Sequence, residues 1–142
     1  MARVLLAEDD DLFADLVTNA LFDRGFVVGR VSDGQQAIDA MRFRAPDVAI
    51  LDCNMPELDG INALRIIRYD RQLYQIPVLI LTGRGGEANE NLARFDGAND
   101  YMCKPCDFNQ LAARLNRLIA NPHQGYNFGV WNEPEAPVRR AI

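Results

Sequence analysis

No apolar run in this sequence approaches the roughly 20 consecutive residues that a membrane-spanning helix requires. The first residues, Met1 to Val4, also lack the charged and then apolar regions of a secretory signal peptide. A basic excess is missing too, because the formal net charge is −5, whereas proteins that bind the nucleic-acid backbone carry a basic face. We therefore expect a cytoplasmic protein with no membrane contact and no direct contact with nucleic acid.

Cysteine is scarce, with three residues in a chain of 142. An odd number in a chain of this size indicates free thiols rather than a disulfide framework. Cys103 and Cys106 form a C-x-x-C pattern, and Cys106 precedes a predicted helix, whose N-terminus can lower a thiol's pKa. Redox motifs of that kind, however, lie next to the first strand-to-helix turn of their fold, and this one follows the last predicted strand. We expect Cys103 to pack into the sheet as a small apolar residue.

The sequence does contain a regular alternation of short apolar runs and amphipathic segments, and its length fits one domain. The expected strands are residues 4–7, 27–31, 47–51, 78–82 and 99–104. Apolar residues recur at helical spacing within residues 12–21, 37–41, 61–68, 88–95 and 111–119. Because nearly every connection is short, this pattern predicts an α/β fold, a parallel five-stranded sheet that right-handed crossovers cover on both faces.

The boundaries of several expected helices carry capping residues. Asp33 and Asp107 are predicted N-caps, and Asp107 with Gln110 resembles a capping box. Gly25 is expected to end the first helix. Residues 121–142 break the alternation, so we expect a domain at 1–120 followed by a non-helical tail rich in proline, glycine and aromatic residues. We hypothesise that its three large aromatic residues dock on the domain or on a partner: Tyr126, Phe128 and Trp131.

Polar residues stand where the predicted strands end, and in a parallel sheet these ends meet at one edge. The residues are Glu8 and Asp9, Asp52, Thr82 and Lys104, after the first, third, fourth and fifth strands. Three carboxylates this close would repel one another unless a divalent cation lay between them. A site made of oxygen ligands favours Mg²⁺ or Mn²⁺.

A metal beside a carboxylate, a hydroxyl and an ammonium suits phosphoryl transfer, whose transition state spreads negative charge over several oxygens. Asp52 is the predicted nucleophile, which would form an aspartyl phosphate. The predicted metal ligands are Glu8, Asp9, Asp52 and the backbone carbonyl of Asn54. Lys104 and Thr82 would each contact a phosphoryl oxygen, and the absence of a side chain at Gly83 would leave the group open to water or to a second protein.

These residues belong to four motifs: AEDD at 7–10, LDCNMPELDG at 51–60, LILTG at 79–83 and DYMCKP at 100–105. Over residues 2 to about 120 the sequence resembles the receiver domain of two-component response regulators. The resemblance implies a flavodoxin-like, doubly wound sheet of order 2-1-3-4-5 and a cis peptide before Pro105. It also implies a switch in which Thr82 and Tyr101 move together. The output face would be the one formed by the fourth helix, the fifth strand and the fifth helix.

The resemblance further implies a sensor histidine kinase or histidine phosphotransferase as phosphoryl donor and a protein as downstream target. We expect a stand-alone receiver, not an enzyme on other substrates, that catalyses only its own phosphorylation and dephosphorylation. A fragment of a larger regulator with DNA-binding or enzymatic output, and a degenerate receiver that acts as a docking module, are the alternatives. A flavodoxin-type cofactor site disagrees with the four acids at 8–11, and a phosphatase with an aspartate nucleophile lacks its usual second acid at Asn54. Cys106 departs from the family, which usually has a phenylalanine there.

Overall fold

The computed structural model describes residues 1–83 and 85–122, apart from the side chains at positions 87 and 88. The strands are β1 (Ala2–Ala7), β2 (Phe26–Val31), β3 (Val48–Leu51), β4 (Val78–Thr82) and β5 (Asp100–Cys103). The helices are α1 (Asp11–Asp23), α2 (Gly34–Phe43), α3 (Gly60–Tyr69), α4 (Glu87–Phe95) and α5 (Phe108–Ala120). Each expected strand and helix is present, with ends shifted by a few residues. The tail and the aromatic docking hypothesis lie outside the described residues.

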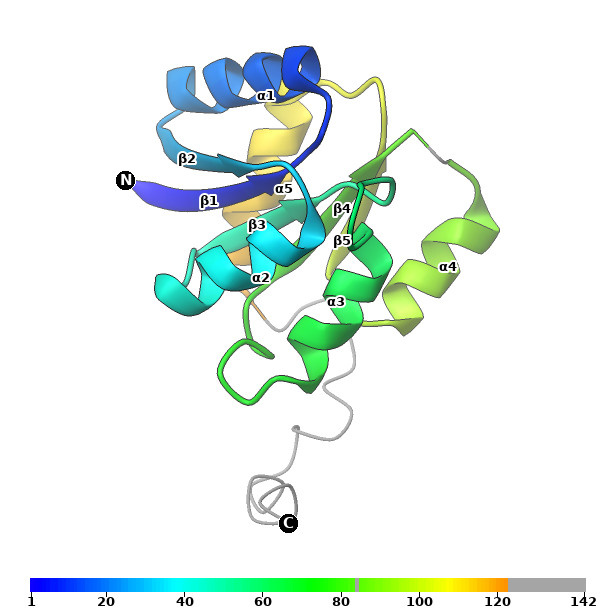
Figure 1. The fold of residues 1–142 in the computed structure, drawn as a ribbon. Coiled ribbons are helices and arrows are strands. Elements are labelled where there is room, and N and C mark those ends of the chain that lie inside the picture. The colour runs from blue at the N-terminus through cyan, green and yellow to red at the C-terminus, as the bar shows by residue number, and fades with distance from the viewer. Residues whose placement is uncertain (84, 123–142) are drawn as a thin grey trace.

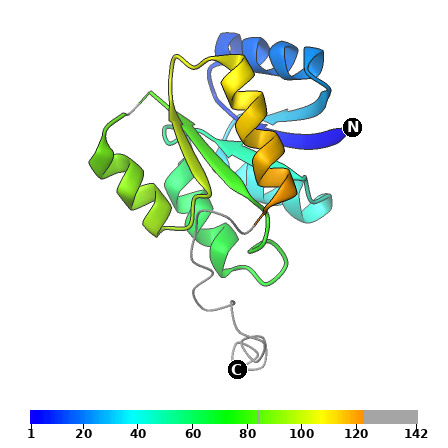
Figure 2. The same cartoon turned by 180° about the vertical axis from the view of Figure 1, so that it is seen from behind.

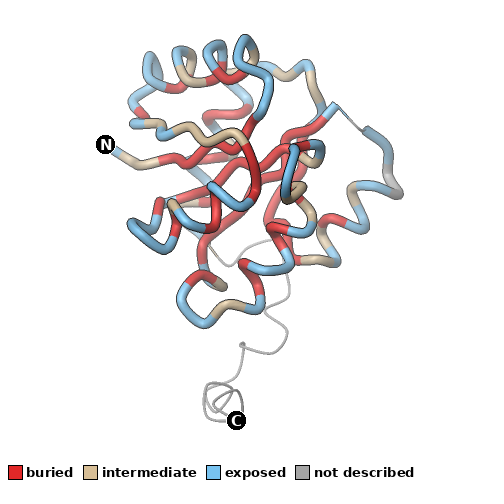
Figure 3. The backbone as a smooth tube through the Cα atoms, viewed as in Figure 1, coloured by how far each residue is buried: buried red, intermediate tan, exposed pale blue. Residues whose placement is uncertain are grey.

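The five strands form one parallel sheet in the order β2-β1-β3-β4-β5, as the resemblance implied. α2, α3 and α4 cover one face of this sheet (Figure 1), and α1 and α5 cover the other (Figure 2). Strands β3 and β4 are buried along their whole length, at the centre of the molecule in Figure 3. Burial on both faces explains why their sequences are continuous apolar runs rather than alternating ones.

Each face of the sheet has its own apolar core. Side chains such as Leu51 and Ile80 pack under α2 and α3. Leu6 and Leu79 pack under α1 and α5 on the opposite face. Among the described side chains of α4 only Ala93 is buried, so this helix is attached to the domain by a small apolar contact. Polar residues such as Asn89 and Asn91 dilute the apolar stripe of this helix.

Aspartate side chains begin four of the five helices. The N-caps of α1, α2, α3 and α5 are Asp10, Asp33, Asp59 and Asp107, and each accepts a hydrogen bond from a backbone N–H in the first turn. The N-caps predicted at Asp33 and Asp107 are thus confirmed. The N-cap position of α4 is Gly86, which has no side chain to cap the helix. Gly25 lies just after α1 with a φ of 94°, a left-handed conformation that suits glycine at a helix end.

A close backbone approach joins the start of α3 to the end of β3. A Cβ atom on Gly60 would overlap the backbone carbonyl of Asp52, and the Gly60 N–H donates to Cys53 O at 3.2 Å. Only a residue without a side chain fits here, which explains the glycine that closes the LDCNMPELDG motif. The packing of α3 therefore depends on the same backbone that carries Asp52.

A buried amide fixes the opposite end of the sheet. Asn99 Oδ1 accepts hydrogen bonds at 2.8 Å from the backbone N–H of Val78 and from the guanidinium of Arg68. Its Nδ2 donates to the backbone carbonyl of Pro122 at 2.9 Å. Arg68, itself 7% exposed, also donates to the carbonyls of Gly97 and of the loop before β4. This network ties the start of β4, α3 and the chain after α5 together.

Candidate functional site

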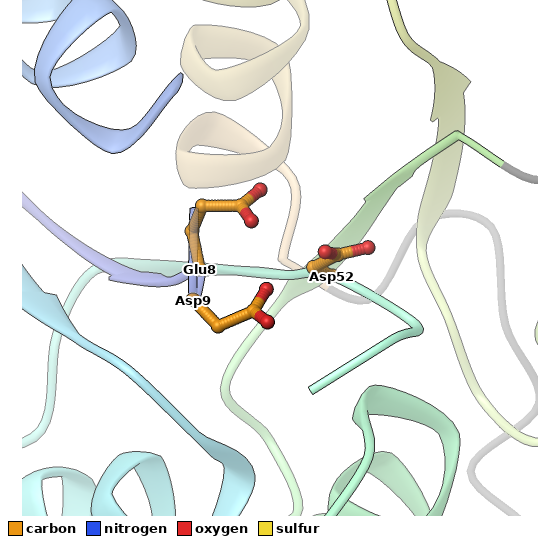
Figure 4. A group of neighbouring side chains, drawn as sticks. All are labelled: Glu8, Asp9 and Asp52. Atoms are coloured by element: carbon orange, nitrogen blue, oxygen red, sulfur yellow. The ribbon is translucent and has the colours of Figure 1, made fainter. Parts of the chain in front are cut away.

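The acidic side chains that follow β1 and β3 lie side by side at the carboxyl edge of the sheet (Figure 4). Glu8, Asp9 and Asp52 each place one carboxylate oxygen within 4.8 Å of the others. β1 and β3 are hydrogen-bonded neighbours with Ala7 opposite Leu51, so the residues that follow them must meet. The clustering predicted from the strand ends is therefore present.

Two of the three carboxylates are buried. Glu8 is 2% and Asp52 5% exposed, whereas Asp9 is open to solvent. Burial, the largest cause, raises the pKa of Glu8, although hydrogen bonds from Lys104 and from the backbone N–H of Asp10 lower it. The negative charge of Asp52 adds to the increase. The pocket thus holds more negative charge than its own hydrogen bonds stabilise, and a cation would relieve it.

Lys104 supplies the positive charge that the chain itself brings to this cluster. Its Nζ lies 2.6 Å from Glu8 Oε1 and 3.4 Å from Asp52 Oδ2. Burial disfavours the ammonium, but the hydrogen bond to Glu8 and the charges of Asp52 and Glu8 outweigh it and raise the pKa of Lys104. The Lys104–Pro105 peptide is cis, as the resemblance implied. Lys104 is therefore a charged group directed at the acids.

The other predicted site residues lie nearby on neighbouring strands. Thr82 ends β4 fully buried, and its carbonyl accepts the Lys104 N–H at 2.8 Å. Asn54 follows Asp52 in the loop, and its N–H donates to Asp52 Oδ1 at 3.3 Å. Tyr101 is 5% exposed and packs with the core under α3. The switching role of Thr82 and Tyr101 and the Asn54 carbonyl as a metal ligand stay predictions.

The donor set fits a hard divalent cation. Glu8, Asp9 and Asp52 offer carboxylate oxygens only, and a backbone carbonyl after β3 would add another oxygen. Oxygen ligands with room for water are what Mg²⁺ and Mn²⁺ prefer, whereas zinc sites use histidine and cysteine. The residues present therefore match the predicted metal by their chemistry.

A cleft of about 770 Å³ opens beside the acids, between the β3–α3 loop, α3 and α4. Its lining residues include Asp9, Asn54, Leu92 and Tyr101. An ion pair of 3.1 Å between Arg65 and Asp96 joins α3 to α4 among the lining residues. Reagents of small size therefore have access to the acidic cluster from this side.

Two contacts at the site were not predicted. The Phe13 ring centroid lies 4.4 Å from Lys104 Nζ. Arg30 donates two hydrogen bonds, of 2.9 and 2.7 Å, to the backbone carbonyl of Glu8. In the sequence Phe13 is one more member of the apolar stripe of its helix and Arg30 one more strand residue, so no local pattern distinguishes them.

The expectation that Cys103 packs into the sheet is wrong. Cys103 is exposed because it is the last residue of β5, an edge strand, and the helices no longer cover it. Cys106 is half-buried and packs against the core under α1 and α5. All three cysteines are free thiols.

We predict that iodoacetamide at neutral pH alkylates Cys103 several times faster than Cys106. The thiolate is the reactive form, and burial, together with the charge of Asp107, raises the pKa of Cys106 despite the opposing effect of Lys104. Peptide mass spectrometry over time measures both rates, and Cys103→Ser is expected to remove the fast phase. Faster labelling of Cys106 would contradict the prediction and favour the redox interpretation.

A five-stranded doubly wound sheet with three acids and a lysine at its carboxyl edge is the arrangement of an α/β domain of the receiver type. Residues 4–116 match the model of the response regulator receiver domain family. The chain therefore belongs to the response regulator receiver family. The flavodoxin-like fold, its strand order and the resemblance drawn from the motifs are confirmed.

Relatives with known names support the assignment. The chain is 37% identical over 128 residues to the transcriptional regulatory protein QseB of Haemophilus influenzae and 36% over 123 residues to CpxR of Escherichia coli K12. These matches cover 90% and 87% of this chain but 57% and 51% of the relatives. The chain thus spans about half the length of these curated relatives. Since both are transcriptional regulators, the predicted absence of nucleic-acid contact has no support from them.

Solved structures agree with the fold. A putative response regulator from Chloroflexus aurantiacus superposes with a TM-score of 0.81 at 28% identity, covering 84% of this chain and 98% of that one. The receiver domain of the sensor histidine kinase PA1611 from Pseudomonas aeruginosa, crystallised with a magnesium ion in its active-site cleft, gives 0.78 at 30% identity, covering 84% and 98%. No helix in the described part of the chain has the length and apolar character needed to cross a membrane.

Proposed function

We propose that this receiver accepts a phosphoryl group on Asp52 from a phosphohistidine of a histidine kinase or histidine phosphotransferase. The observation that carries the proposal is the position of Asp52, whose buried carboxylate lies within 4.8 Å of Glu8 and Asp9 and 3.4 Å from Lys104 Nζ. Nucleophile, predicted metal ligands and a cation meet in one pocket. The magnesium ion in the related Pseudomonas aeruginosa receiver supports Mg²⁺ as the metal.

The proposed reaction moves the phosphoryl group without a change in oxidation state. An Asp52 carboxylate oxygen forms a bond to phosphorus as the bond from phosphorus to the histidine nitrogen breaks, and the electron pair leaves with the imidazole. Lys104 donates a hydrogen bond to a transferring oxygen, and Thr82 donates one to another. When bound by Glu8, Asp9 and Asp52, the metal supplies charge neutralisation to the phosphoryl oxygens.

We propose that the chain catalyses only its own phosphorylation and dephosphorylation. Hydrolysis of many substrate molecules needs a general acid or base beside the nucleophile. The residue two positions after Asp52 is Asn54, and its side-chain amide cannot act as a general acid or base. It directs its backbone N–H at the Asp52 carboxylate instead. The acyl phosphate is therefore expected to persist long enough to carry a signal.

The proposed output is a protein contact made by α4, β5 and α5. One buried carboxylate on β5, Asp100, binds Arg94 of α4 at 3.2 Å and two arginines of α5, Arg114 at 2.9 Å and Arg117 at 3.2 Å. The three elements therefore form one connected surface next to Tyr101. A change at Tyr101 would bias this whole surface, because phosphorylation has only to favour one of two existing arrangements.

Two forms of output remain proposals. A stand-alone receiver would act through the α4–β5–α5 face on a separate protein or in a phosphorelay in the cytoplasm. A receiver that belongs to a longer regulator would act on an attached DNA-binding domain, and the named relatives, of which this chain covers 57% and 51%, favour this second form. A pull-down with phosphorylated against unphosphorylated chain separates them, since only the first predicts a phosphorylation-dependent protein partner.

Phosphoryl uptake is tested by incubating the protein with acetyl phosphate and MgCl₂ and measuring its intact mass. We expect a gain of one phosphoryl group, no gain when EDTA replaces MgCl₂, and loss of the gain in hydroxylamine, which cleaves acyl phosphates. EDTA should prevent phosphoryl uptake because it removes the metal ion, whose positive charge stabilises the transferring oxygens. No gain with magnesium present would leave the docking-module alternative.

A further inference from the structure

Lys104 has a third contact besides its two carboxylates. Its Nζ lies 4.4 Å from the centroid of the Phe13 ring, within the distance at which a cation and an aromatic face attract each other. Glu8 follows β1, Asp52 follows β3 and Phe13 belongs to α1. The ammonium is therefore held by three separate elements of the fold.

Phe13 is anchored through its backbone and through partial burial of its side chain. The backbone N–H of Phe13 donates to Asp10 Oδ1 at 3.2 Å, so the N-cap of α1 positions this residue directly. The side chain is half-buried and packs against the core under α1 and α5. The flexible side chain of Lys104 can therefore pack against the partly buried ring of Phe13.

The Phe13 ring differs from the carboxylates of Glu8 and Asp52 because a divalent cation does not compete with Lys104 for it. Glu8 and Asp52 offer Lys104 the same kind of oxygen that a divalent cation takes as a ligand. An aromatic ring offers no oxygen, so a divalent cation bound by the carboxylates does not compete with Lys104 for the Phe13 ring. The contact with Phe13 can therefore be kept when the carboxylates bind a metal ion.

We propose that Phe13 is a positioning residue that holds the Lys104 ammonium at the phosphoryl site through its ring face. The inference rests on the proposed function, because it assigns Lys104 to the transferring group. Phe13 touches neither metal nor phosphoryl oxygen and acts through Lys104 alone. The contact joins the first turn of α1 to the loop after β5. Phe13 lies just after the AEDD motif, and Lys104 belongs to the DYMCKP motif.

The rate of phosphoryl uptake from acetyl phosphate tests the proposal through a double-mutant cycle. Phe13→Leu keeps an apolar side chain but removes the ring, and should slow uptake about threefold, the size of one cation–π contact. Phe13→Tyr keeps the ring and should restore the rate. In a Lys104→Met background, Phe13→Leu should have no further effect. Phe22→Leu, on the exposed far end of the same helix, is the matched control and should leave the rate unchanged.

An NMR measurement without metal or phosphoryl donor separates this proposal from the proposed function. Protons over an aromatic face are shielded, so the Lys104 ε-methylene resonances should lie upfield in the wild type and return to ordinary values in Phe13→Leu. Unchanged resonances, or an equal slowing by Phe13→Leu with and without Lys104, would overturn the role of Phe13. Upfield resonances in a protein that takes up no phosphoryl group would overturn the proposed function and leave the contact standing.

Discussion

Asp52→Asn is expected to abolish phosphoryl uptake while the protein stays folded. The amide is not a nucleophile, whereas its side-chain oxygen can still accept the hydrogen bond that Asp52 Oδ1 receives from the backbone N–H of Asn54. The substitution also removes a negative charge that raises the pKa of buried Glu8, so the unfolding free energy should not fall. Intact mass after incubation with acetyl phosphate and MgCl₂, together with a urea titration, measures both effects.

Asp59→Asn is the matched control for this experiment. Asp59 lies in the same loop and lines the same cleft, but its carboxylate caps α3 by accepting the backbone N–H of Asn62 at 2.8 Å. Asparagine caps helices as well as aspartate does, so stability and uptake should both persist. Uptake that survives in Asp52→Asn would show that another acid, with Asp9 the nearest exposed one, carries the phosphoryl group.

Gly60→Ala is expected to lower the free energy of unfolding by about 3 kcal/mol, the upper end of the usual cost of overpacking. The added methyl group would overlap the backbone carbonyl of Asp52, and backbone atoms cannot rotate away as a flexible side chain does. Either α3 or the end of β3 must move. Since Asp52 is carried by that backbone, phosphoryl uptake should fall as well. Urea unfolding followed by circular dichroism gives the change in stability.

Gly29→Ala provides the comparison, because a Cβ atom at this position on the edge strand β2 would meet no atom within 4 Å. Its effect on the free energy of unfolding should stay within about 0.5 kcal/mol. If Gly60→Ala and Gly29→Ala cost the same, the cost at position 60 would come from the loss of glycine itself and not from the contact with Asp52.

The fold and the acidic cluster were predictable because both follow from patterns along the chain. Apolar runs too short for helices define buried strands, and alternation with helices makes the strands parallel. Parallel strands bring their carboxyl ends to one edge, which places Asp52 beside Glu8 and Asp9 although about 43 residues separate them. The N-caps at Asp33 and Asp107 were readable for the same reason, since an aspartate acts on its own helix.

The contacts of Phe13 and Arg30 at the site were not predictable in this way. Each depends on a side chain that reaches a distant element of the fold only in one particular rotamer. The contact between Phe13 and Lys104 needs the ring to turn toward the loop after β5, and nothing near either residue encodes this. The same holds for Arg30, which reaches the backbone carbonyl of Glu8 from the neighbouring strand. Cys103 was misjudged because strand alternation predicts a direction for a side chain but not where the covering helices stop.

The amide of Asn99 holds the backbone of Pro122 at the amino ends of β4 and β5, whereas the phosphoryl chemistry is proposed at their carboxyl ends. β5 has four residues, so about 13 Å of strand separates the two ends. Pro122, the last residue that the structure describes, therefore lies at the end of the domain opposite to the proposed phosphoryl site. A phosphoryl donor that binds at the carboxyl edge of the sheet would not have to disturb the hydrogen bond between Asn99 and Pro122.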